Sequence, residues 1–350
     1  MKETLVDLLR CPLTKEKLAM EVYEREERTY GDITVSEIKS GLLTAPCGYL
    51  YPIVKGVPRL QVESFLEHED FLRNHKKDYE SLKKKIFADY EYVIKLAIKK
   101  NKKSKQSFGM EWNMFRHGQD TTWDFTKDRR KQRFLKEINV TADSLKGKRL
   151  FDVGCGNGVL TSGISEFGIE TFGLDASNSV ENAYLHNTNP NVHYIQGDLQ
   201  NPPFASETFD IVYSTGVIHH TNNTELSFSC ISGLTKKGGI LYVWLYRPEK
   251  DFKHNALNFT RAITNKFPIK VQYWLFLILL VPQGLLKMRL RGKKRNWREQ
   301  LVSYFDVLSC EFRFEHTPKE TEVWYFKRDF EKTHVTVEEY LGFGMYGVRK

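Results

Sequence analysis

Short apolar segments of strand length alternate with longer helix-like segments along this chain, most regularly between residues 148 and 246. Such alternation is typical of a parallel sheet whose strands are joined by crossover helices. The expected strands are 149–153, 170–175, 193–198, 209–214 and 238–246, and the expected helices are 159–167, a segment from about 179, and 224–232.

The carboxyl end continues the same pattern. Thr317 and Glu320 form a capping-box pair around Pro318, which would occupy the first helical position. We therefore expect a helix to about residue 328, and the alternating segments 333–337 and 342–348 predict two closing strands.

The amino-terminal part has a different texture. Residues 1–62 contain short apolar runs with several glycines and prolines, and 50–60 predicts a strand, a turn and a second strand. Residues 63–106 are charged and helix-like. We therefore divide the chain into a small N-terminal module (1–62), a basic helical arm (63–106) and a main domain (107–350).

One uncharged segment, 271–286, could be read in several ways. Its 16 residues are interrupted by Pro282 and Gly284, which is short for a transmembrane helix. We expect a buried helix. An interfacial helix is the alternative, because basic residues follow as far as Arg295 and would suit anionic headgroups, giving a peripheral membrane contact through 271–295.

Charge and cysteine usage narrow the class of protein. The formal net charge is +9, and much of the excess lies between Lys76 and Lys105, where lysines alternate with apolar residues. This pattern favours a solvated helix face, with a surface for an anionic substrate, RNA or a membrane as the alternative. The five cysteines are scattered singly, and the first residues lack a signal-peptide core, so a cytoplasmic location is expected, with membrane association as a variant.

A glycine-rich turn after the first expected strand carries the main chemical signal. Glycines at a strand-to-helix turn let the backbone approach a ligand closely. The spacing G-x-G-x-G lacks the third glycine of a dinucleotide site. Asp152, two residues before the first glycine, suits a ligand with an ammonium group better than a pyrophosphate. The turn consists of Asp152, Val153, Gly154, Cys155, Gly156, Asn157 and Gly158.

These residues, FDVGCGNG, resemble the first motif of class I S-adenosylmethionine-dependent methyltransferases, and the later strands fit the same family in order over roughly 107–350. The resemblance implies an α/β, Rossmann-like fold with a doubly wound, mostly parallel seven-stranded sheet. It also implies S-adenosyl-L-methionine as cofactor. A helical insert at about 251–312, after the fifth strand, would cover the substrate.

The resemblance assigns further cofactor contacts. Asp175, followed by Ala176, ends the second strand, where an acidic residue binds the ribose hydroxyls. Asp198 and Leu199 match the position that meets the adenine. Ser214 and Thr215, with Gly216, would line the methionine moiety. Phe108 and Trp112 lie in a segment similar to one that helps to cover the cofactor in bacterial small-molecule methyltransferases; a hydrophobic anchor for the arm is the equal alternative.

His219 and His220 follow the fourth strand, close to where a methyl group would emerge. A histidine can take a proton near neutral pH, so either could be a general base, although a structural role is an alternative for both. The Asn/Asp-Pro-Pro-aromatic run of enzymes that methylate exocyclic amines or glutamine amides is replaced here by Tyr213-Ser214-Thr215-Gly216, which argues against those targets.

The N-terminal module resembles the zinc-ribbon-like activator subunits of tRNA and protein methyltransferases. Relatives hold metal with two C-x-x-C pairs. Here Cys11 and Cys47 are present, but Thr14 and Thr44 stand at the partner positions, so we expect a degenerate module without metal.

Three functions fit this sequence. The first is methyl transfer to a small molecule such as a sugar, a lipid-linked intermediate or a natural product, at oxygen or nitrogen rather than carbon. An RNA or protein methyltransferase is the second, with nucleic acid a less favoured partner, and a non-catalytic cofactor-binding scaffold is the third. The sequence does not predict the acceptor or the oligomeric state.

Overall fold

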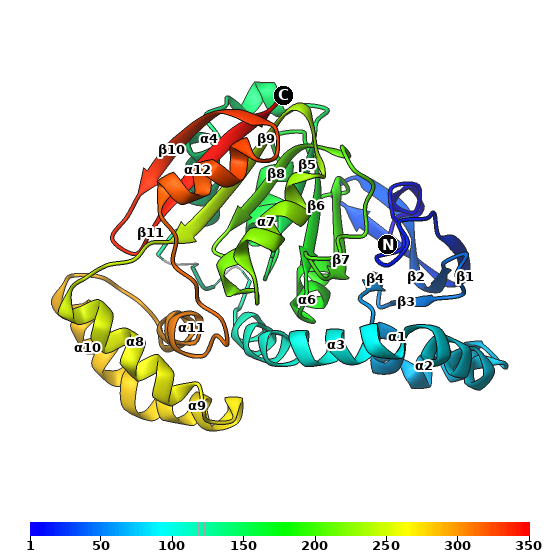
Figure 1. Cartoon of the computed structure of the whole chain (residues 1–350), viewed down its shortest axis with the longest axis horizontal. Helices are drawn as coiled ribbons and strands as arrows, with labels where there is room; N and C mark the ends of the chain where they lie inside the picture. The colour runs from blue at the N-terminus through cyan, green and yellow to red at the C-terminus, as the bar shows by residue number, and fades with distance from the viewer. Residues whose placement is uncertain (118, 122–123) are drawn as a thin grey trace.

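The computed structural model describes residues 1–117, 119–121 and 124–350. Within them eleven strands form one continuous sheet, in the order β1-β2-β3-β4-β7-β6-β5-β8-β9-β11-β10 (Figure 1). The last seven in this order form the doubly wound part. Their bounds are β7 (Val192–Gly197), β6 (Glu170–Asp175), β5 (Arg149–Val153), β8 (Phe209–Thr215), β9 (Thr235–Tyr246), β11 (Gly342–Arg349) and β10 (Phe330–Glu338).

The pairing confirms the expected α/β, Rossmann-like fold. Strands β7, β6, β5, β8 and β9 pair in parallel, whereas β11 runs antiparallel to both β9 and β10. All seven strands lie within about three residues of the expected segments. Most are buried apolar runs closed by a turn, whereas β10 is mostly half-buried or exposed and was predicted from its alternation. The expectation of seven strands was incomplete, since the N-terminal part adds four more to the same sheet.

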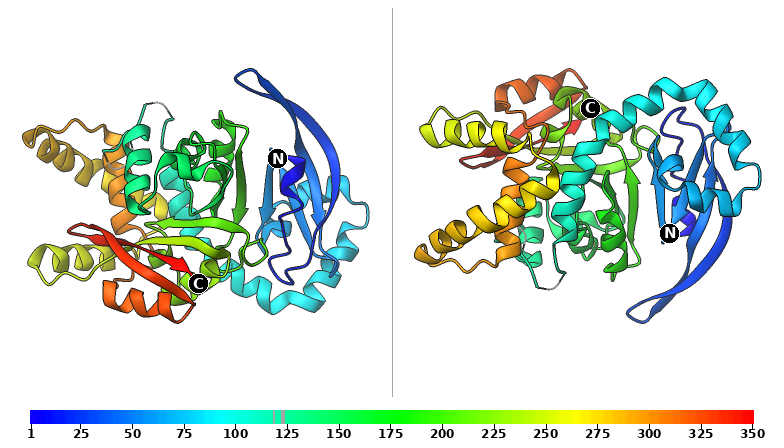
Figure 2. Two further views of the ribbon diagram at one scale, coloured as in Figure 1. Left: turned by 90° about the horizontal axis from the view of Figure 1, so that it is seen from above. Right: turned by 90° about the horizontal axis from the view of Figure 1, so that it is seen from below.

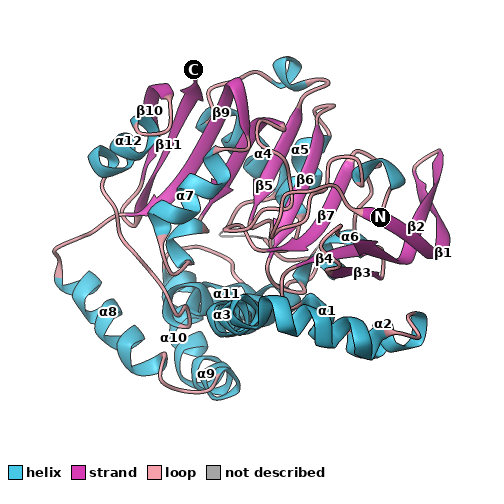
Figure 3. Cartoon of the chain, turned by 45° about the vertical axis from the view of Figure 1, so that its right-hand side comes forward, coloured by secondary structure: helices cyan, strands magenta, loops and turns pink. Residues whose placement is uncertain are grey.

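Helices cover both faces of the seven strands (Figure 3). Phe134 and Leu160 pack against Tyr213 and Tyr242 on one face, and Phe228 packs with the C-terminal helix on the other. The helices of the first face are α4 (Lys127–Glu137), α5 (Val159–Ser165) and α6 (Ser179–Leu185), and those of the second are α7 (Thr224–Ser232) and α12 (Pro318–Phe326). Short 3-10 turns are η1 (Glu3–Leu5), η2 (Ala142–Leu145) and η3 (Ile218–His220).

The N-terminal strands extend the sheet beyond β7. A long hairpin of β1 (Ala19–Tyr30) and β2 (Ile33–Thr44) pairs with β3 (Leu50–Val54), and β3 pairs with β4 (Val57–Leu60). Strand β4 then pairs in parallel with β7. The strand–turn–strand at 50–60 was expected. The β1–β2 hairpin was not expected, because β1 is rich in charged residues and has only one buried position.

Three helices connect this part to the main domain: α1 (Ser64–Glu67), α2 (Glu69–His75) and α3 (Tyr79–Asn113). Helix α3 runs along the carboxyl edge of the sheet (Figure 1) and continues past residue 106, so the expected arm and the start of the main domain share one helix. The division of the chain into domains stays a prediction.

The segment between β9 and α12 is helical. It contains α8 (Phe252–Thr264), α9 (Ile269–Leu275), the π-helical turn η4 (Phe276–Leu280), α10 (Val281–Leu290) and α11 (Trp297–Leu308). In the described part of the chain, one helical run, Ile269–Leu290, is long and apolar enough to cross a membrane, and only 22% of its most apolar stretch is buried.

The expectation of a buried helix at 271–286 is therefore wrong. The side chains of Trp274, Ile278 and Leu286 are 59%, 64% and 60% exposed. Only a minority of this run, including Phe276 and Val281, is buried. The absence of charge correctly predicted an apolar helix. It does not predict whether the apolar side chains are buried against the rest of the protein.

Candidate functional site

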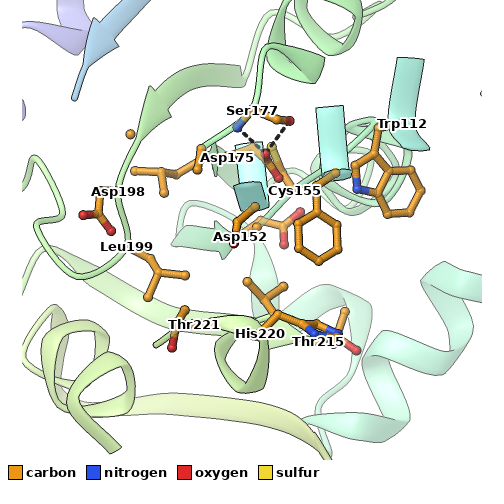
Figure 4. A pocket seen from close by; sticks show the side chains of 18 of the residues that line it. Trp112, Asp152, Cys155, Asp175, Ser177, Asp198, Leu199, Thr215, His220 and Thr221 are labelled. Carbon is orange, nitrogen blue, oxygen red and sulfur yellow. Dashed lines mark hydrogen bonds between the residues drawn. The ribbon is translucent and has the colours of Figure 1, made fainter. Parts of the chain in front are cut away.

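A pocket opens at the carboxyl ends of β5, β6, β7 and β8, where the expected cofactor residues gather (Figure 4). Helix α3 lies across it, and the segment after α11 closes its far end. Thirteen of the residues singled out in the sequence line it: Phe108, Trp112, Asp152, Gly154, Cys155, Asn157, Asp175, Ala176, Asp198, Leu199, Thr215, Gly216 and His220.

The glycine turn has a backbone that only glycine adopts readily. Gly154, Gly156 and Gly158 have φ values of 77°, 53° and 72°, in the left-handed region. A Cβ atom on Gly154 would lie 2.4 Å from the side chain of Val217. The turn therefore requires glycine for its conformation and for the close packing of its neighbours, and it leaves its backbone at the pocket wall.

Asp175 is held at the end of β6 by three hydrogen bonds. Its carboxylate accepts from the backbone N–H and hydroxyl of Ser177 at 2.8 and 2.7 Å (Figure 4) and from the backbone N–H of Gly156 at 3.0 Å. Burial raises the pKa of this carboxyl, while the hydrogen bonds counteract the shift. The side chain is fixed at the pocket wall, as a residue that binds ribose hydroxyls would be.

Asp152 lies beneath the same turn and is 3% exposed. It accepts a hydrogen bond from the hydroxyl of Thr161 at 2.5 Å, and burial raises its pKa to about 6. The pocket is lined next to it by Arg130. A bound ammonium group would favour the ionised form of Asp152, so its carboxylate fits the cationic end of the cofactor.

Asp198 already has a cationic partner in this structure. Lys100 of α3 forms an ion pair with its carboxylate and also donates to Gln200 at 3.1 Å. The other carboxylate oxygen accepts from the backbone N–H of Gln200 at 2.9 Å. An adenine amino group arriving at Asp198 would share this carboxylate with Lys100.

Helix α3 covers the glycine turn with an aromatic side chain. A Cβ atom on Gly156 would lie 2.8 Å from the indole of Trp112, so the ring packs directly on the turn. Phe108, one turn earlier, lines the pocket and lies 5.4 Å from the ring of His220 between centroids. Both residues expected to cover the cofactor thus line the pocket. This packing is compatible with a role as cofactor cover and with a role as hydrophobic anchor for the arm.

The far end of the pocket brings together a histidine and a carboxyl group. The ring of His220 is hydrogen-bonded through Nδ1 to the backbone carbonyl of Phe312 at 2.8 Å. This contact directs the second nitrogen, Nε2, which has no hydrogen-bond partner in the described structure, toward Asp306 at 3.9 Å. Tyr246 donates its hydroxyl proton to the other oxygen of Asp306 at 3.0 Å.

Burial sets the protonation of this pair. It lowers the pKa of His220 to about 4 and raises that of Asp306 to about 6. At neutral pH the ring is therefore neutral, and Nε2 can accept a proton. A carboxylate beside it would stabilise the imidazolium that forms.

Four of the residues singled out in the sequence do not line the pocket. His219 is fully buried against the rings of Trp244 and Tyr246, and burial lowers its pKa well below the usual range. Ser214 is buried with its hydroxyl 3.5 Å from the carbonyl of Val153. The other two, Gly156 and Gly158, give the turn its left-handed conformation but are not among the residues that line the pocket.

Several residues at this site had no signal in the sequence. Lys100 and Asp306 come from helices distant along the chain, and neither belongs to a local motif. Glu111 of α3 is fully buried with both carboxyl oxygens unpartnered, and burial beside Asp306 raises its pKa well above the usual range.

The residues of the expected degenerate metal site lie inside the N-terminal part. Cys11 is buried with its sulfur 3.3 Å from the hydroxyl of Tyr51, and Cys47 is half-buried. Among the described residues, no group of three or more histidine, cysteine or acidic side chains is arranged to hold a metal ion.

Comparison with known proteins identifies the central segment. Residues 151–243 match the family model described as a methyltransferase domain. The ubiquinone biosynthesis O-methyltransferase of Brucella ovis is 31% identical over 102 residues, which cover 28% of this chain and 41% of that protein. The enzyme of the same name from Mesorhizobium japonicum is 30% identical over 122 residues, covering 34% and 49%. The matches thus span less than half the length of these relatives.

A solved structure of a SAM-dependent methyltransferase from Anabaena variabilis aligns with a TM-score of 0.42 at 17% identity, covering 71% of this chain and 95% of that one. The family match covers β5 to β9, the strands that build the pocket. Residues 151–243 are therefore a methyltransferase domain, and S-adenosylmethionine is its cofactor.

Proposed function

We propose that the whole protein transfers a methyl group from S-adenosylmethionine to a hydroxyl group of a small molecule. The observation that carries this proposal is a pocket with two chemically different ends. Asp152, Asp175 and Asp198 line one end, and the neutral His220 beside Asp306 lines the other. When bound, S-adenosylmethionine supplies an activated methyl group. The relatives named as O-methyltransferases support an oxygen acceptor.

The residues of this chain would hold and shield the reactants. The backbone of the glycine turn and Asp175 would bind the ribose side, Asp198 and Leu199 the adenine, and Asp152 the ammonium group. Trp112 and Phe108 of α3 would exclude water from above. Thr215, at the end of β8, lines the pocket on the way to His220.

His220 would act as the general base. Its Nδ1 is engaged with the carbonyl of Phe312, so the incoming proton of the acceptor hydroxyl is taken at Nε2. Asp306, held by Tyr246, would then stabilise the charged ring. His219, buried away from the pocket, would support the packing of η3.

The alternative of an RNA substrate has less support. Several lysines of the basic arm form ion pairs within the chain: Lys76 with Glu21, Lys83 with Glu69, Lys95 with Glu91, and Lys105 with Glu63 and Glu67. These contacts neutralise part of the arm that had suggested a nucleic-acid surface. Because the five cysteines are free, we also propose a cytoplasmic location.

We further infer that the N-terminal module, with its zinc-ribbon-like resemblance, stabilises the methyltransferase domain. Support comes from the pairing of β4 with β7 and from Arg59, which is 1% exposed. Its guanidinium donates to Gln196 at 2.9 Å and to Glu181 at 2.7 Å, both in the methyltransferase domain. The module would thereby support β7, whose end leads to Asp198.

The test is a transfer assay with methyl-labelled S-adenosylmethionine and a panel of small phenols, alcohols and amines, with RNA and protein as further acceptors. We expect label on a hydroxyl compound. We expect His220→Ala to lower kcat by about 10²- to 10⁴-fold with little change in cofactor affinity. His75→Ala, an exposed histidine on α2, is the matched control and should be unaffected. Label on RNA or protein alone would contradict the proposal.

A further inference from the structure

The helices α9, η4 and α10 present a continuous stripe of exposed apolar side chains. Its members follow one another at intervals of three, four or eight residues, so they lie on one helical face. Their exposed fractions range from 42% to 80%. We call them the apolar stripe: Val271, Trp274, Ile278, Leu286 and Leu290.

The opposite face of the same helices is occupied by protein. Phe276 and Val281 are buried in a cluster with Leu301 and Phe305 of α11. Gly284 also faces α11, since a Cβ atom there would lie 2.5 Å from the hydroxyl of Tyr304. The stripe is therefore the outward face of a packed helical unit and cannot fold onto α11 itself.

Helix α8 exposes apolar side chains as well. Phe252, Phe259 and Ile263 are 85%, 69% and 45% exposed. Figure 2 shows α8 and the α9–α10 helices projecting from the side of the molecule opposite to the N-terminal strands. The projecting part thus offers large apolar side chains on both helices.

The charge of this region has a single sign. Residues 252–298 contain 11 lysines and arginines and no aspartate or glutamate. Lys266, Lys270, Lys287, Arg289 and Arg291 form no ion pair within the described chain, in contrast to the lysines of the arm. Exposed apolar side chains flanked by unpaired cations complement a surface in which an apolar interior lies beneath anionic headgroups.

We propose that this helical insert docks the protein onto an anionic lipid surface, with the apolar stripe entering the interface and the flanking cations contacting the headgroups. The helix lies on the surface rather than crossing the bilayer, because one of its faces is packed against α11. A second copy of the chain is disfavoured as the occupant, because it would bring two sets of unpaired cations together.

The proposed surface is connected to the pocket through α11. Leu301 and Phe305 of this helix pack beneath the stripe, while Asp306 of the same helix lines the pocket beside His220. Phe312, four residues beyond the helix end, lines the pocket too. Docking would therefore place the acceptor end of the site near the lipid surface. The docking surface itself does not rest on the proposed methyl transfer.

The test is co-sedimentation of the full chain with vesicles made of equal parts phosphatidylcholine and phosphatidylglycerol, beside vesicles of phosphatidylcholine alone. We expect binding to the anionic vesicles, much weaker binding to the neutral ones, and release by about 0.5 M NaCl. No binding to anionic vesicles would overturn the proposal. Binding that only detergent reverses would also overturn it, because it would indicate a helix that spans the bilayer.

Two pairs of variants locate the surface. Trp274→Glu/Ile278→Glu should weaken vesicle binding at least about tenfold, whereas Leu226→Glu/Val323→Glu, at exposed apolar positions of α7 and α12, should not. Lys287→Glu/Arg289→Glu should weaken it similarly, whereas Lys84→Glu/Lys85→Glu on α3 changes the net charge equally and should not. Equal effects within either pair would contradict the assignment.

Light scattering of the soluble protein and calorimetric titration with S-adenosylhomocysteine complete the design. Dimers that disappear in Trp274→Glu/Ile278→Glu would assign the stripe to a second copy and overturn the proposal; a monomer that binds anionic vesicles supports it. Normal cofactor binding in the stripe variants would show that their loss of vesicle binding is not misfolding. If the unchanged protein does not bind S-adenosylhomocysteine, the proposed function is rejected. The conclusion from vesicle binding is not affected by that result.

Discussion

At the residue scale, the carboxyl group of Asp306 is the least expected feature of the site. It is buried beside His220, accepts a hydrogen bond from Tyr246, and lies on a helix that the sequence pattern gave only as part of a cover. Glu111, also buried, approaches it from α3. The carboxyl pair becomes apparent only when α3 and α11 are seen to pack together, through the hydroxyls of Ser107 and Ser309 at 2.6 Å.

The raised pKa of Asp306 makes a prediction about stability. Burial raises its pKa to about 6 in the folded protein, above the value of 3.8 for an unfolded chain. Between these values the folded state holds a proton that the unfolded state has released. The free energy of unfolding should therefore fall as the pH rises through this window, by about 3 kcal/mol for this group.

Asp306→Asn should remove this contribution and flatten the pH dependence, which denaturant unfolding at pH values from about 4 to about 7 would measure. The pKa of Asp152 is also raised to about 6, and its contribution to the pH dependence of unfolding should be unchanged in this variant. Asp143→Asn, an exposed position, serves as the control. An unchanged pH dependence in Asp306→Asn would show that its carboxyl is not buried as described.

The sequence indicated which strand ends line the pocket but not the contribution of Asp306, and the reason is physical. The glycine turn, Asp175 and Asp198 occupy fixed places at the ends of consecutive strands, so their order along the chain determines their order in space. Residues contributed by α3 and α11 depend on how distant helices pack, which no local spacing encodes. For this reason the sequence indicated the strand-end residues of the pocket but not Lys100 of α3 or Asp306 of α11.

At the element scale, helix α3 links the arm to the cofactor site. Lys100 forms an ion pair with Asp198, and Trp112 packs on Gly156, so a single helix contacts both Asp198 and the glycine turn. Trp112→Ala should uncover the turn and lower the affinity for S-adenosylhomocysteine about tenfold, because an aromatic contact and the exclusion of water are lost.

Isothermal titration calorimetry would measure this change. Trp274→Ala, at an exposed tryptophan of the insert, is the matched control and should bind as the unchanged protein does. Equal affinities for Trp112→Ala and the unchanged protein would show that the ring serves only as an anchor for the arm, the alternative that the sequence left open.

Helices and strands were predicted correctly where the spacing of apolar residues along the chain matched the buried face of the element. The strands β5 to β9 and β11 are largely buried runs bounded by turns, whereas β10 was predicted from its alternation of apolar and polar residues. The β1–β2 hairpin was missed because charged residues such as Glu24 and Glu27 occupy the exposed positions of β1. The helix at 271–286 was found but placed inside, because periodicity and composition do not distinguish a face covered by protein from one left open.

At the scale of the whole molecule, the continuous sheet makes the N-terminal module part of the same structural unit as the methyltransferase domain. Arg59 is the central contact, since its buried guanidinium is paired with Glu181 across the junction. Arg59→Ala should lower the free energy of unfolding by about 3 kcal/mol, because it removes the donors to Gln196 and Glu181 and leaves a cavity at a buried position.

Lys55→Ala is the matched control for Arg59→Ala. Lys55 pairs with the same carboxylate at 2.8 Å, but its side chain is 71% exposed, so its removal should cost at most about 1 kcal/mol. Denaturant unfolding followed by circular dichroism would compare the two variants. Equal costs, or a separate early transition of the N-terminal module in the unchanged protein, would contradict a shared structural unit.

The most direct test of the central claim is calorimetric titration of S-adenosylmethionine and S-adenosylhomocysteine into the protein, beside Asp175→Ala and the exposed control Asp143→Ala. We predict micromolar binding to the unchanged protein and to Asp143→Ala, and at least about a hundredfold loss in Asp175→Ala, because the hydrogen bonds to the ribose hydroxyls are removed. Absence of binding to the folded, unchanged protein, or binding unaffected by Asp175→Ala, would contradict the account of this site.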